Sequence, residues 1–162
     1  MAIVTDLETD REAGTGNMNP KTEESPLRRI LIVDDEEAWI RLWRLNLEHC
    51  FKCKGVGAHS AAEAFAECEQ AVPDVVVTNI IMPGMDGVDM FFEVHRRYPT
   101  LPVIFCSAMF RKQDEERLKE RMPGVFAFLA KPPDMERLIA TIAAALRMTG
   151  EEFTKPPHER PV

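Results

Sequence analysis

The sequence predicts an α/β fold, a three-layer arrangement in which a five-stranded parallel sheet lies between two layers of helices. Three observations support this prediction. Short apolar runs alternate with longer amphipathic stretches, and the strongest runs are apolar along their whole length. Such runs are typical of parallel strands that are covered on both faces. The length of 162 residues suits one domain with tails.

Apolar spacing and turn residues predict the first five elements. Continuous apolar runs place strands at 29–33 and 74–78, and a weaker run that ends in glycines places one at 52–56. Helical spacing predicts the first helix at 36–48, through Trp39, Leu42, Trp43 and Leu47. A capping box predicts the second helix at 60–71, through Ser60 and Glu63.

The second half of the pattern repeats this alternation. Apolar runs place strands at 103–106 and 125–130. A loop that ends at Gly87 precedes a helix at 88–98, and a charged stretch at 113–122 forms a helix anchored by Leu118 and Met122. The last helix is predicted at 134–148, with Asp134 as its cap and with Leu138, Ile142 and Leu146 on its buried stripe.

Both ends of the chain differ in composition from this core. Residues 1–28 are rich in Glu, Asp, Thr, Gly, Asn and Pro without periodicity, so they are predicted to form a disordered arm. Residues 149–162 hold three prolines among charges and are predicted to be a flexible tail. The folded domain is therefore placed at 29–148. The tail is too short for a DNA-binding or enzymatic output domain, so we expect a stand-alone module.

Charge and hydropathy exclude several classes of function. The net charge is −7 and no basic stripe runs along any segment, so binding to nucleic acid or to anionic lipid is not expected. No apolar run approaches the roughly 18–20 residues that a membrane span needs. The N-terminus carries acidic residues and no apolar stretch of the kind found in signal peptides, so the expected location is the cytoplasm.

Four cysteines remain to be placed. Cys50 and Cys53 have C-x-x-C spacing, but a zinc site would need a second close pair or histidines at finger spacing. His49 and His59 lie nearby, which leaves a metal site conceivable. The favoured interpretation is that these two residues, with Cys68 and Cys106, are small core or surface thiols in a reducing compartment.

Polar residues follow four of the five predicted strands. Asp34 and Asp35 come after the first strand, Asn79 after the third, Ser107 after the fourth and Lys131 after the fifth. Right-handed crossovers bring the carboxyl ends of parallel strands to one rim, where sites in such sheets lie. Two carboxylates, an amide, a hydroxyl and an ammonium at one rim indicate a functional site, because folding alone does not require that set.

These residues resemble the receiver domain of two-component response regulators, of the chemotaxis-regulator type. The resemblance covers 29–148 and rests on four stretches. They are Ile-Leu-Ile-Val-Asp34-Asp35, Thr78-Asn-Ile-Ile-Met-Pro-Gly-Met-Asp-Gly87, Ser107-Ala108 and Lys131-Pro132. The resemblance implies a flavodoxin-like sheet of strand order 2-1-3-4-5 and a role in phosphorelay signalling rather than in enzymatic catalysis.

The resemblance also assigns roles to the phosphoacceptor position and to the residues that would bind a metal ion. The aspartate that accepts the phosphoryl group lies three residues before the Met-Pro pair, and here that position is Asn79. The resemblance implies that Asp35 is a direct Mg²⁺ ligand and Asp34 a water-mediated one. The backbone carbonyl of Ile81 is implied to be the third protein contribution to the metal.

Three further residues are implied to sense the phosphoryl group. Lys131 corresponds to the ammonium that pairs with acceptor and phosphoryl oxygens, and Ser107 to the switch hydroxyl. Phe128 stands at the position of the switch aromatic and is expected to lie inward, because it lacks a phenolic hydroxyl. The Lys131–Pro132 peptide bond is implied to be cis.

Asparagine changes the chemistry that this site can perform. A carboxamide is neutral and its nitrogen lone pair is delocalised, so Asn79 should not accept a phosphoryl group. Mg²⁺ binding should weaken without vanishing, because one anionic ligand is lost. Two origins of Asn79 remain open: a natural pseudo-receiver that works without phosphate, or an engineered Asp-to-Asn form.

The sequence thus predicts a signalling protein that acts through protein–protein contact. The expected partner is a histidine kinase, a phosphotransfer protein or an output protein, and a second copy of the chain is a further candidate. The expected contact face comprises residues 111–121, Phe128 and residues 135–147. The alternative is a metal-dependent, phosphatase-like hydrolase, for which Asp34 and Asp35 are the only candidate nucleophiles. A flavin-binding module has less support, because the loops lack a phosphate cradle.

Overall fold

The computed structural model describes residues 27–148. Most of the predicted arm and the whole predicted tail lie outside the described residues, so those predictions are untested. The described strands are β1 (Arg28–Val33), β2 (Cys53–Ala58), β3 (Val75–Thr78), β4 (Val103–Ser107) and β5 (Ala127–Ala130). The described helices are α1 (Glu37–Cys50), α2 (Ala61–Gln70), α3 (Gly87–Arg97), η1 (Lys112–Asp114), α4 (Glu115–Arg121) and α5 (Met135–Met148).

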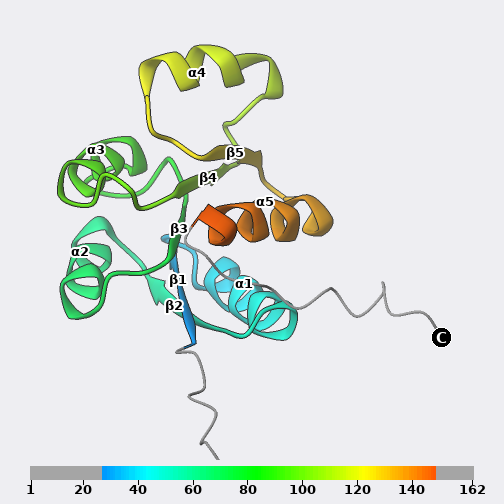
Figure 1. Ribbon diagram of the computed structural model, residues 1–162. Helices are drawn as coiled ribbons and strands as arrows, with labels where there is room; N and C mark the ends of the chain where they lie inside the picture. Colours follow the sequence, from blue (N-terminus) through cyan, green and yellow to red (C-terminus); the bar gives the residue numbers. More distant parts are fainter. Residues whose placement is uncertain (1–26, 149–162) are drawn as a thin grey trace, which may run out of the picture.

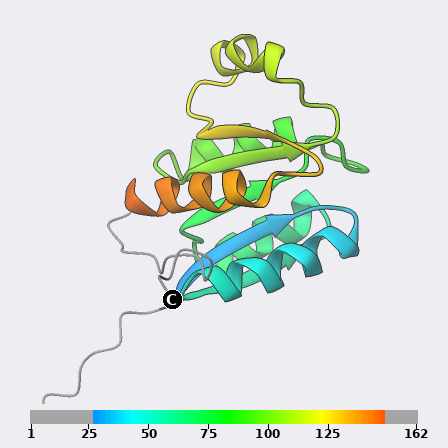
Figure 2. The same cartoon turned by 90° about the vertical axis from the view of Figure 1, so that its right-hand side faces the viewer.

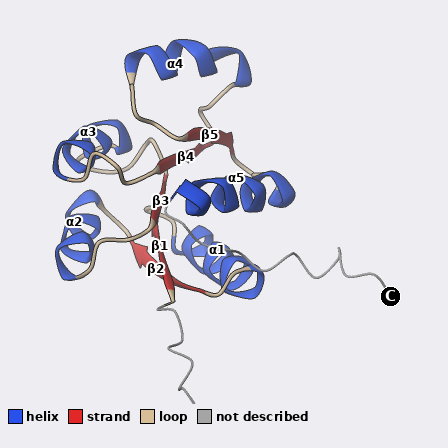
Figure 3. Cartoon of the chain, in the orientation of Figure 1, coloured by secondary structure: helices blue, strands red, loops and turns tan. Residues whose placement is uncertain are grey.

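The five strands form one parallel sheet in the order β2-β1-β3-β4-β5, which confirms the predicted α/β fold and strand order. Helices α1 and α5 cover one face of this sheet, and α2 and α3 cover the other (Figure 1). Figure 2 looks onto the layer of α1 and α5, and Figure 3 separates the sheet from its helices by colour. None of the described helices is long and apolar enough to cross a membrane.

Each central strand supplies side chains to two separate cores. In β1, Ile30 and Ile32 pack with the buried residues of α1 and α5. Leu31 and Val33, which alternate with them, pack with those of α2 and α3. Because successive side chains of a strand point to opposite faces, an unbroken apolar run is what a strand covered on both sides requires. The continuous hydrophobicity seen in the sequence therefore has a direct structural cause.

The two predicted helix caps have different outcomes. The Asp134 carboxylate accepts hydrogen bonds from the N–H groups two and three residues later, so this cap is confirmed. The Ser60 hydroxyl accepts from the Glu63 N–H at 3.2 Å, as a capping box requires. The Glu63 carboxylate, however, accepts from the N–H of His59 at 2.8 Å rather than from Ser60. Only half of the predicted capping box is therefore formed.

Helix α4 and β5 begin later than the sequence predicts. The first turn of the predicted helix is the 3₁₀ helix η1, so the α-helical part runs from Glu115 to Arg121. Gly124 then adopts a positive φ of 98° and turns the chain, which delays β5 to Ala127. No residue within α4 is buried. Both views place α4 beyond the β4–β5 side of the sheet (Figures 1 and 2).

Strand β2 forms one edge of the sheet. The backbone N–H of Gly55 in this strand donates to the Glu48 carboxylate of α1 at 2.9 Å. Arg44 of the same helix lies so close that a Cβ atom at residue 55 would meet its Cγ at 2.9 Å. Glycine thus lets α1 approach this edge and lets an α1 side chain occupy a backbone donor of the edge strand.

All four cysteines are buried and none forms a disulfide. Burial raises the pKa of Cys53 to about 12, with a smaller contribution from the nearby Glu48 carboxylate. Burial likewise raises the pKa of Cys106 to about 12. A thiol of such high pKa carries almost no thiolate near neutral pH, so neither side chain is a reactive nucleophile. The interpretation of these residues as core thiols is confirmed.

Candidate functional site

The carboxyl ends of β1, β3, β4 and β5 bring the predicted rim residues together. Asp34 and Asp35 leave β1, and Asn79 leaves β3 beside it, where the N–H of Asn79 donates to Val33 O at 2.9 Å. The N–H of Lys131 donates to the carbonyl of Ser107 at 3.1 Å, which joins the ends of β4 and β5. The parallel register thus builds one polar cluster from four separate stretches of sequence.

The Asn79 carboxamide is fixed by three hydrogen bonds. Its Oδ1 accepts from the N–H of Ile80 at 2.9 Å. Its Nδ2 donates to the carbonyl of Ile81 at 2.7 Å and to Asp35 Oδ1 at 3.3 Å. A flipped amide would turn Nδ2 toward a donor and Oδ1 toward two acceptors, so only this orientation satisfies all partners. Asn79 is 9% exposed, so its hydrogen bonds have little competition from water.

Asp34 and Lys131 form an ion pair beneath the rim. The side chain of Asp34 is fully buried and that of Lys131 is 5% exposed. Asp34 Oδ2 accepts from Lys131 Nζ, and Asp34 Oδ1 accepts from the N–H of Glu36 at 3.0 Å. Both carboxylate oxygens are therefore occupied, which is what a charge this deeply buried requires.

Two tryptophans complete the surroundings of Lys131. Its Nζ lies 4.9 Å from the ring centroid of Trp39 and 6.0 Å from that of Trp43. Ammonium groups at such distances are attracted to the electron-rich ring face. The helical spacing of both tryptophans predicted only that they belong to the first helix. No sequence signal indicated their contact with Lys131, because that contact joins residues far apart in the chain.

Ser107 and Phe128 occupy the predicted switch positions and both are buried. Ser107 Oγ accepts from the N–H of Met109 at 3.2 Å, so the hydroxyl serves the turn that follows β4. Phe128 is fully buried and stacks between Phe105 and Phe110, with ring centroids 5.5 Å apart on each side. The expectation that Phe128 lies inward is confirmed. Its inclusion in an exposed contact face is wrong, because the side chain reaches no surface.

The oxygen atoms implied to face Mg²⁺ suit a hard cation in kind but not in arrangement. Two carboxylates and a carbonyl are the ligands that Mg²⁺ prefers. Here the two Asp34 oxygens accept from Lys131 and Glu36, while Asp35 Oδ1 and the Ile81 carbonyl both accept from Asn79. A cation could reach these oxygens only by displacing hydrogen bonds that already exist. In this arrangement the site does not fit the ion.

The predicted cis bond between Lys131 and Pro132 is present.

A second polar cluster lies next to the rim, where β2 meets α2. His59 Nε2 lies 2.6 Å from Glu37 of α1, and Nδ1 lies 3.0 Å from Glu63 of α2. The hydrogen bond to Glu37, and then that to Glu63, raises the pKa of His59. These side chains are about half exposed, and no motif in the sequence links all three of them.

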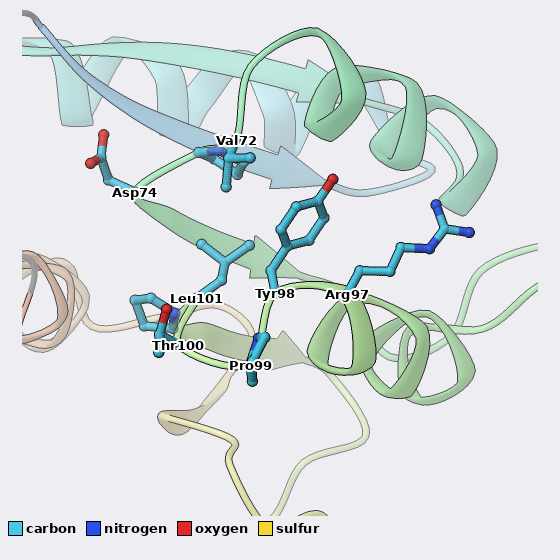
Figure 4. Close-up of a pocket in the computed structure, with 9 residues that line it drawn as sticks. Val72, Asp74, Arg97, Tyr98, Pro99, Thr100 and Leu101 are labelled. Carbon is cyan, nitrogen blue, oxygen red and sulfur yellow. The ribbon is translucent and has the colours of Figure 1, made fainter.

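A pocket of about 320 Å³ lies at the opposite ends of the strands (Figure 4). It is bordered by Asp74, which precedes β3, and by Leu101, which precedes β4. The Asp74 carboxylate is occupied, because Oδ2 accepts from the N–H of Arg29 at 2.7 Å and Oδ1 pairs with Arg28. This pocket is separate from the rim and contains none of the predicted site residues.

Comparison with known proteins adds a family assignment to this geometry. Residues 30–143 match the response regulator receiver domain. The transcriptional regulatory protein TrcR of Mycobacterium tuberculosis is 31% identical over 78% of this chain and 48% of its own length. The DNA-binding transcriptional regulator NtrC of Escherichia coli is 28% identical over 72% of this chain and 24% of its own length. The chain therefore spans half or less of these relatives.

Solved structures support the same assignment. A response regulator receiver domain protein from Clostridium thermocellum has a TM-score of 0.67 and 25% identity, over 76% of this chain and 97% of that one. A CheY-like receiver domain protein from Methanospirillum hungatei has a TM-score of 0.68 and 24% identity, over 78% of this chain and all of the other, and shows the shared fold. The matched segment includes every residue of the rim and all of the sheet except the first two residues of β1, so this chain belongs to the response regulator receiver domain family.

Proposed function

We propose that this receiver accepts no phosphoryl group at residue 79 and signals through protein–protein contact. The observation that carries the proposal is the Asn79 carboxamide, which stands at the end of β3 where the resemblance expects the acceptor aspartate. An amide has no anionic oxygen to attack phosphorus, and its Oδ1 is already bonded to the N–H of Ile80.

The surrounding residues support the same function. Phosphoryl transfer needs an aligned nucleophile and neutralised charge. Lys131, the cation that would neutralise the transferred group, is paired with Asp34 and almost fully buried. Ser107 Oγ is engaged by the N–H of Met109. Each of these groups already has a partner within the chain. An incoming phosphate would therefore add little binding free energy.

Receiver domains generally bind Mg²⁺ beside the phosphorylation site. In this chain we propose that an ion could bind Asp34, Asp35 and the Ile81 carbonyl only after the hydrogen bonds of Asn79 have broken, so that Asn79 reduces the affinity. When bound, the ion would supply positive charge at the rim. Asp34 contributes little to such binding while both of its oxygens are occupied. The hydrolase alternative has less support, since both Asp34 oxygens and Asp35 Oδ1 already accept hydrogen bonds that lower their nucleophilicity.

The proposed contact face is the exposed side of α4 and α5. Arg111, Lys119 and Arg121 are exposed there, and α4 contributes no buried residue to the core. Phe128 supports this face from beneath rather than touching a partner. The proposed partner is a histidine kinase, a phosphotransfer protein or an output protein, or a second copy of the chain. Nucleic acid is not a proposed partner of this segment, although the relatives are named as transcriptional regulators.

Intact-mass spectrometry after incubation with acetyl phosphate and Mg²⁺ tests the central claim. The unmodified chain should gain no phosphoryl mass, because residue 79 offers no nucleophile. Asn79→Asp is the matched control and should gain one hydroxylamine-sensitive phosphoryl group. A stoichiometric adduct on the unmodified chain would refute the proposal.

Affinity capture tests the contact face. Arg111→Glu or Lys119→Glu should weaken capture of the partner while the melting temperature changes little, because both side chains are exposed. Ser107→Ala should leave capture intact, since no phosphate draws that hydroxyl inward. Capture that is lost in Ser107→Ala but retained in both surface variants would point instead to a pocket that senses another anion.

A further inference from the structure

We propose that the carboxamide nitrogen of Asn79 takes the place of the divalent cation, so that hydrogen bonds of the chain itself close the site. The proposal deepens the function above, since it rests on the assignment of Asp35 and Ile81 as groups that would face the ion. It goes beyond the loss of a nucleophile, because it gives Asn79 a structural role in holding the site closed. The receiver would then hold one conformation whether or not metal is present.

The geometry of the amide carries this inference. Nδ2 has two N–H groups, and the two acceptors within reach are the Ile81 carbonyl at 2.7 Å and Asp35 Oδ1 at 3.3 Å. The two N–H hydrogens of Nδ2, which carry positive partial charge, thus lie against two oxygens that the resemblance assigns to the metal. The bond from Ile80 N–H to Asn79 Oδ1 at 2.9 Å fixes which end of the amide points at them.

An aspartate in the same position could not close the site in this way. It would direct a second carboxylate oxygen at the Ile81 carbonyl and at Asp35, so that three oxygens would face one another with no hydrogen between them. Like charges held that close repel unless a cation lies between them. Asparagine removes one negative charge and supplies two donors, so repulsion becomes two hydrogen bonds.

The remaining charges of the rim are stabilised without an ion. Asp34 is compensated by Lys131, and its second oxygen accepts from the N–H of Glu36. Asp35 is exposed, so water solvates the part of its charge that Asn79 does not. A cation placed between Asp35 and the Ile81 carbonyl would require metal–oxygen distances of roughly 2.0–2.1 Å. The amide nitrogen stands in that position and must leave before an ion can enter.

Thermal unfolding of the full chain, in EDTA and in rising concentrations of Mg²⁺, tests whether the amide replaces the ion. The unmodified protein should melt at the same temperature in both conditions. Asn79→Asp should melt at a lower temperature in EDTA and should be restored by Mg²⁺ in the millimolar range. Asn79→Ala should also melt lower than the unmodified protein in EDTA, because it loses the amide bonds without adding charge.

Tryptophan fluorescence reports metal binding at the same site, since Trp39 and Trp43 lie beside Lys131. Mg²⁺ should bind to Asn79→Asp at least about tenfold more tightly than to the unmodified protein, a difference of about 1.4 kcal/mol. The readout does not depend on phosphorylation. It also remains usable if Asn79→Asp is unfolded in EDTA, because Mg²⁺ should then restore the native spectrum.

Three results would overturn the inference. One is a saturable Mg²⁺ response of the unmodified protein at the concentrations that saturate Asn79→Asp. Another is an Asn79→Asp variant that ignores Mg²⁺, which would mean that residue 79 does not face the ion. The third is an Asn79→Ala variant as stable as the parent in EDTA. Each leaves the mass-spectrometric test unaffected, so tight metal binding without a phosphoryl adduct would refute this inference alone.

Discussion

The rim around Asn79 differs from the region around α4, which lies beyond the β5 edge of the sheet (Figure 1) and is called the edge below. The two regions hold their functional residues on the same sheet in different ways. At the rim, Asp34 and Lys131 are almost fully buried and every side chain described there has a partner within the chain. At the edge, α4 buries none of its own residues. It is held by Leu118, which is partly buried, and by Phe110 and Met122 on either side of the helix. The rim is fixed by specific polar contacts, whereas the edge depends on a few apolar ones.

This difference indicates where the molecule can respond to a partner. A set of mutually satisfied buried polar groups has one favoured arrangement, because any other leaves a donor or a charge unpaired. A short helix with few buried contacts can shift or open at small cost in free energy. Phe128 lies between the two regions, stacked on Phe105 and Phe110. The aromatic stack thus connects β4 and β5 with Phe110, which precedes α4.

Breaking the buried ion pair should give the largest effect. Lys131→Met leaves the Asp34 carboxylate buried without its counter-ion, and such changes destabilise a protein by about 3–5 kcal/mol. Urea unfolding measures the loss. Lys119→Met is the matched control, because its pair with Glu115 at 2.7 Å is exposed and its removal should cost at most about 0.5 kcal/mol. Equal losses in the two variants would remove the contrast between rim and edge.

A smaller effect is expected in hydrogen exchange, where the amides of α4 should be less protected than those of the other helices. Amides of α4 should exchange more than about tenfold faster than those of α3, which corresponds to at least about 1.4 kcal/mol in opening free energy. The reason is burial, since α3 contributes the buried residues Met90, Phe91 and Val94 to the core and α4 contributes only the partly buried Leu118. Residue-resolved exchange by NMR makes the measurement. Equal protection of the two helices would show that α4 is held more firmly than its contacts suggest.

The cluster of His59, Glu37 and Glu63 should give the smallest effect. The two carboxylates raise the pKa of His59 in the folded protein above its usual value, first through Glu37 and then through Glu63. The resulting stabilisation is complete below the unfolded pKa of about 6.5 and is lost as pH rises through the folded pKa. The urea midpoint should therefore fall slightly between about pH 6 and pH 8.5 relative to His59→Gln. Parallel profiles for the two proteins would contradict this. The effect is small because the side chains are about half exposed.

The sequence predicted the sheet well because both of its signals are local. Apolar runs such as that of β1 reflect burial on both faces, and the polar residues that follow four of the strands reflect a shared rim. The family resemblance supplied the strand order. What could not be predicted is how the rim residues pair. Asp34 pairs with Lys131 from 97 positions away, and the amide of Asn79 chooses its partners according to the backbone directions of Ile80 and Ile81.

The misplaced boundaries have a similar explanation. Helical periodicity at 113–122 does not distinguish a 3₁₀ turn from an α-helical one, because three residues are too few to show either period. The turn at Gly124 depends on a positive φ that the sequence permits but does not require. The half-formed capping box reflects competition, since His59 N–H reached the Glu63 carboxylate in place of Ser60 N–H.

The contact between Glu48 and the edge strand β2 bears on how this protein behaves in crowded solution. An outer strand exposes backbone groups on which a foreign strand can pair, and this is a common start of fibrous aggregation. The Glu48 carboxylate occupies the N–H of Gly55 and brings negative charge to that edge, while Arg44 lies over the same glycine. A strand arriving from a second molecule must first displace an acidic side chain. Glu48 therefore hinders the addition of a further strand at this edge. Glu48→Ala should leave the fold intact and make the protein more prone to aggregate at high concentration.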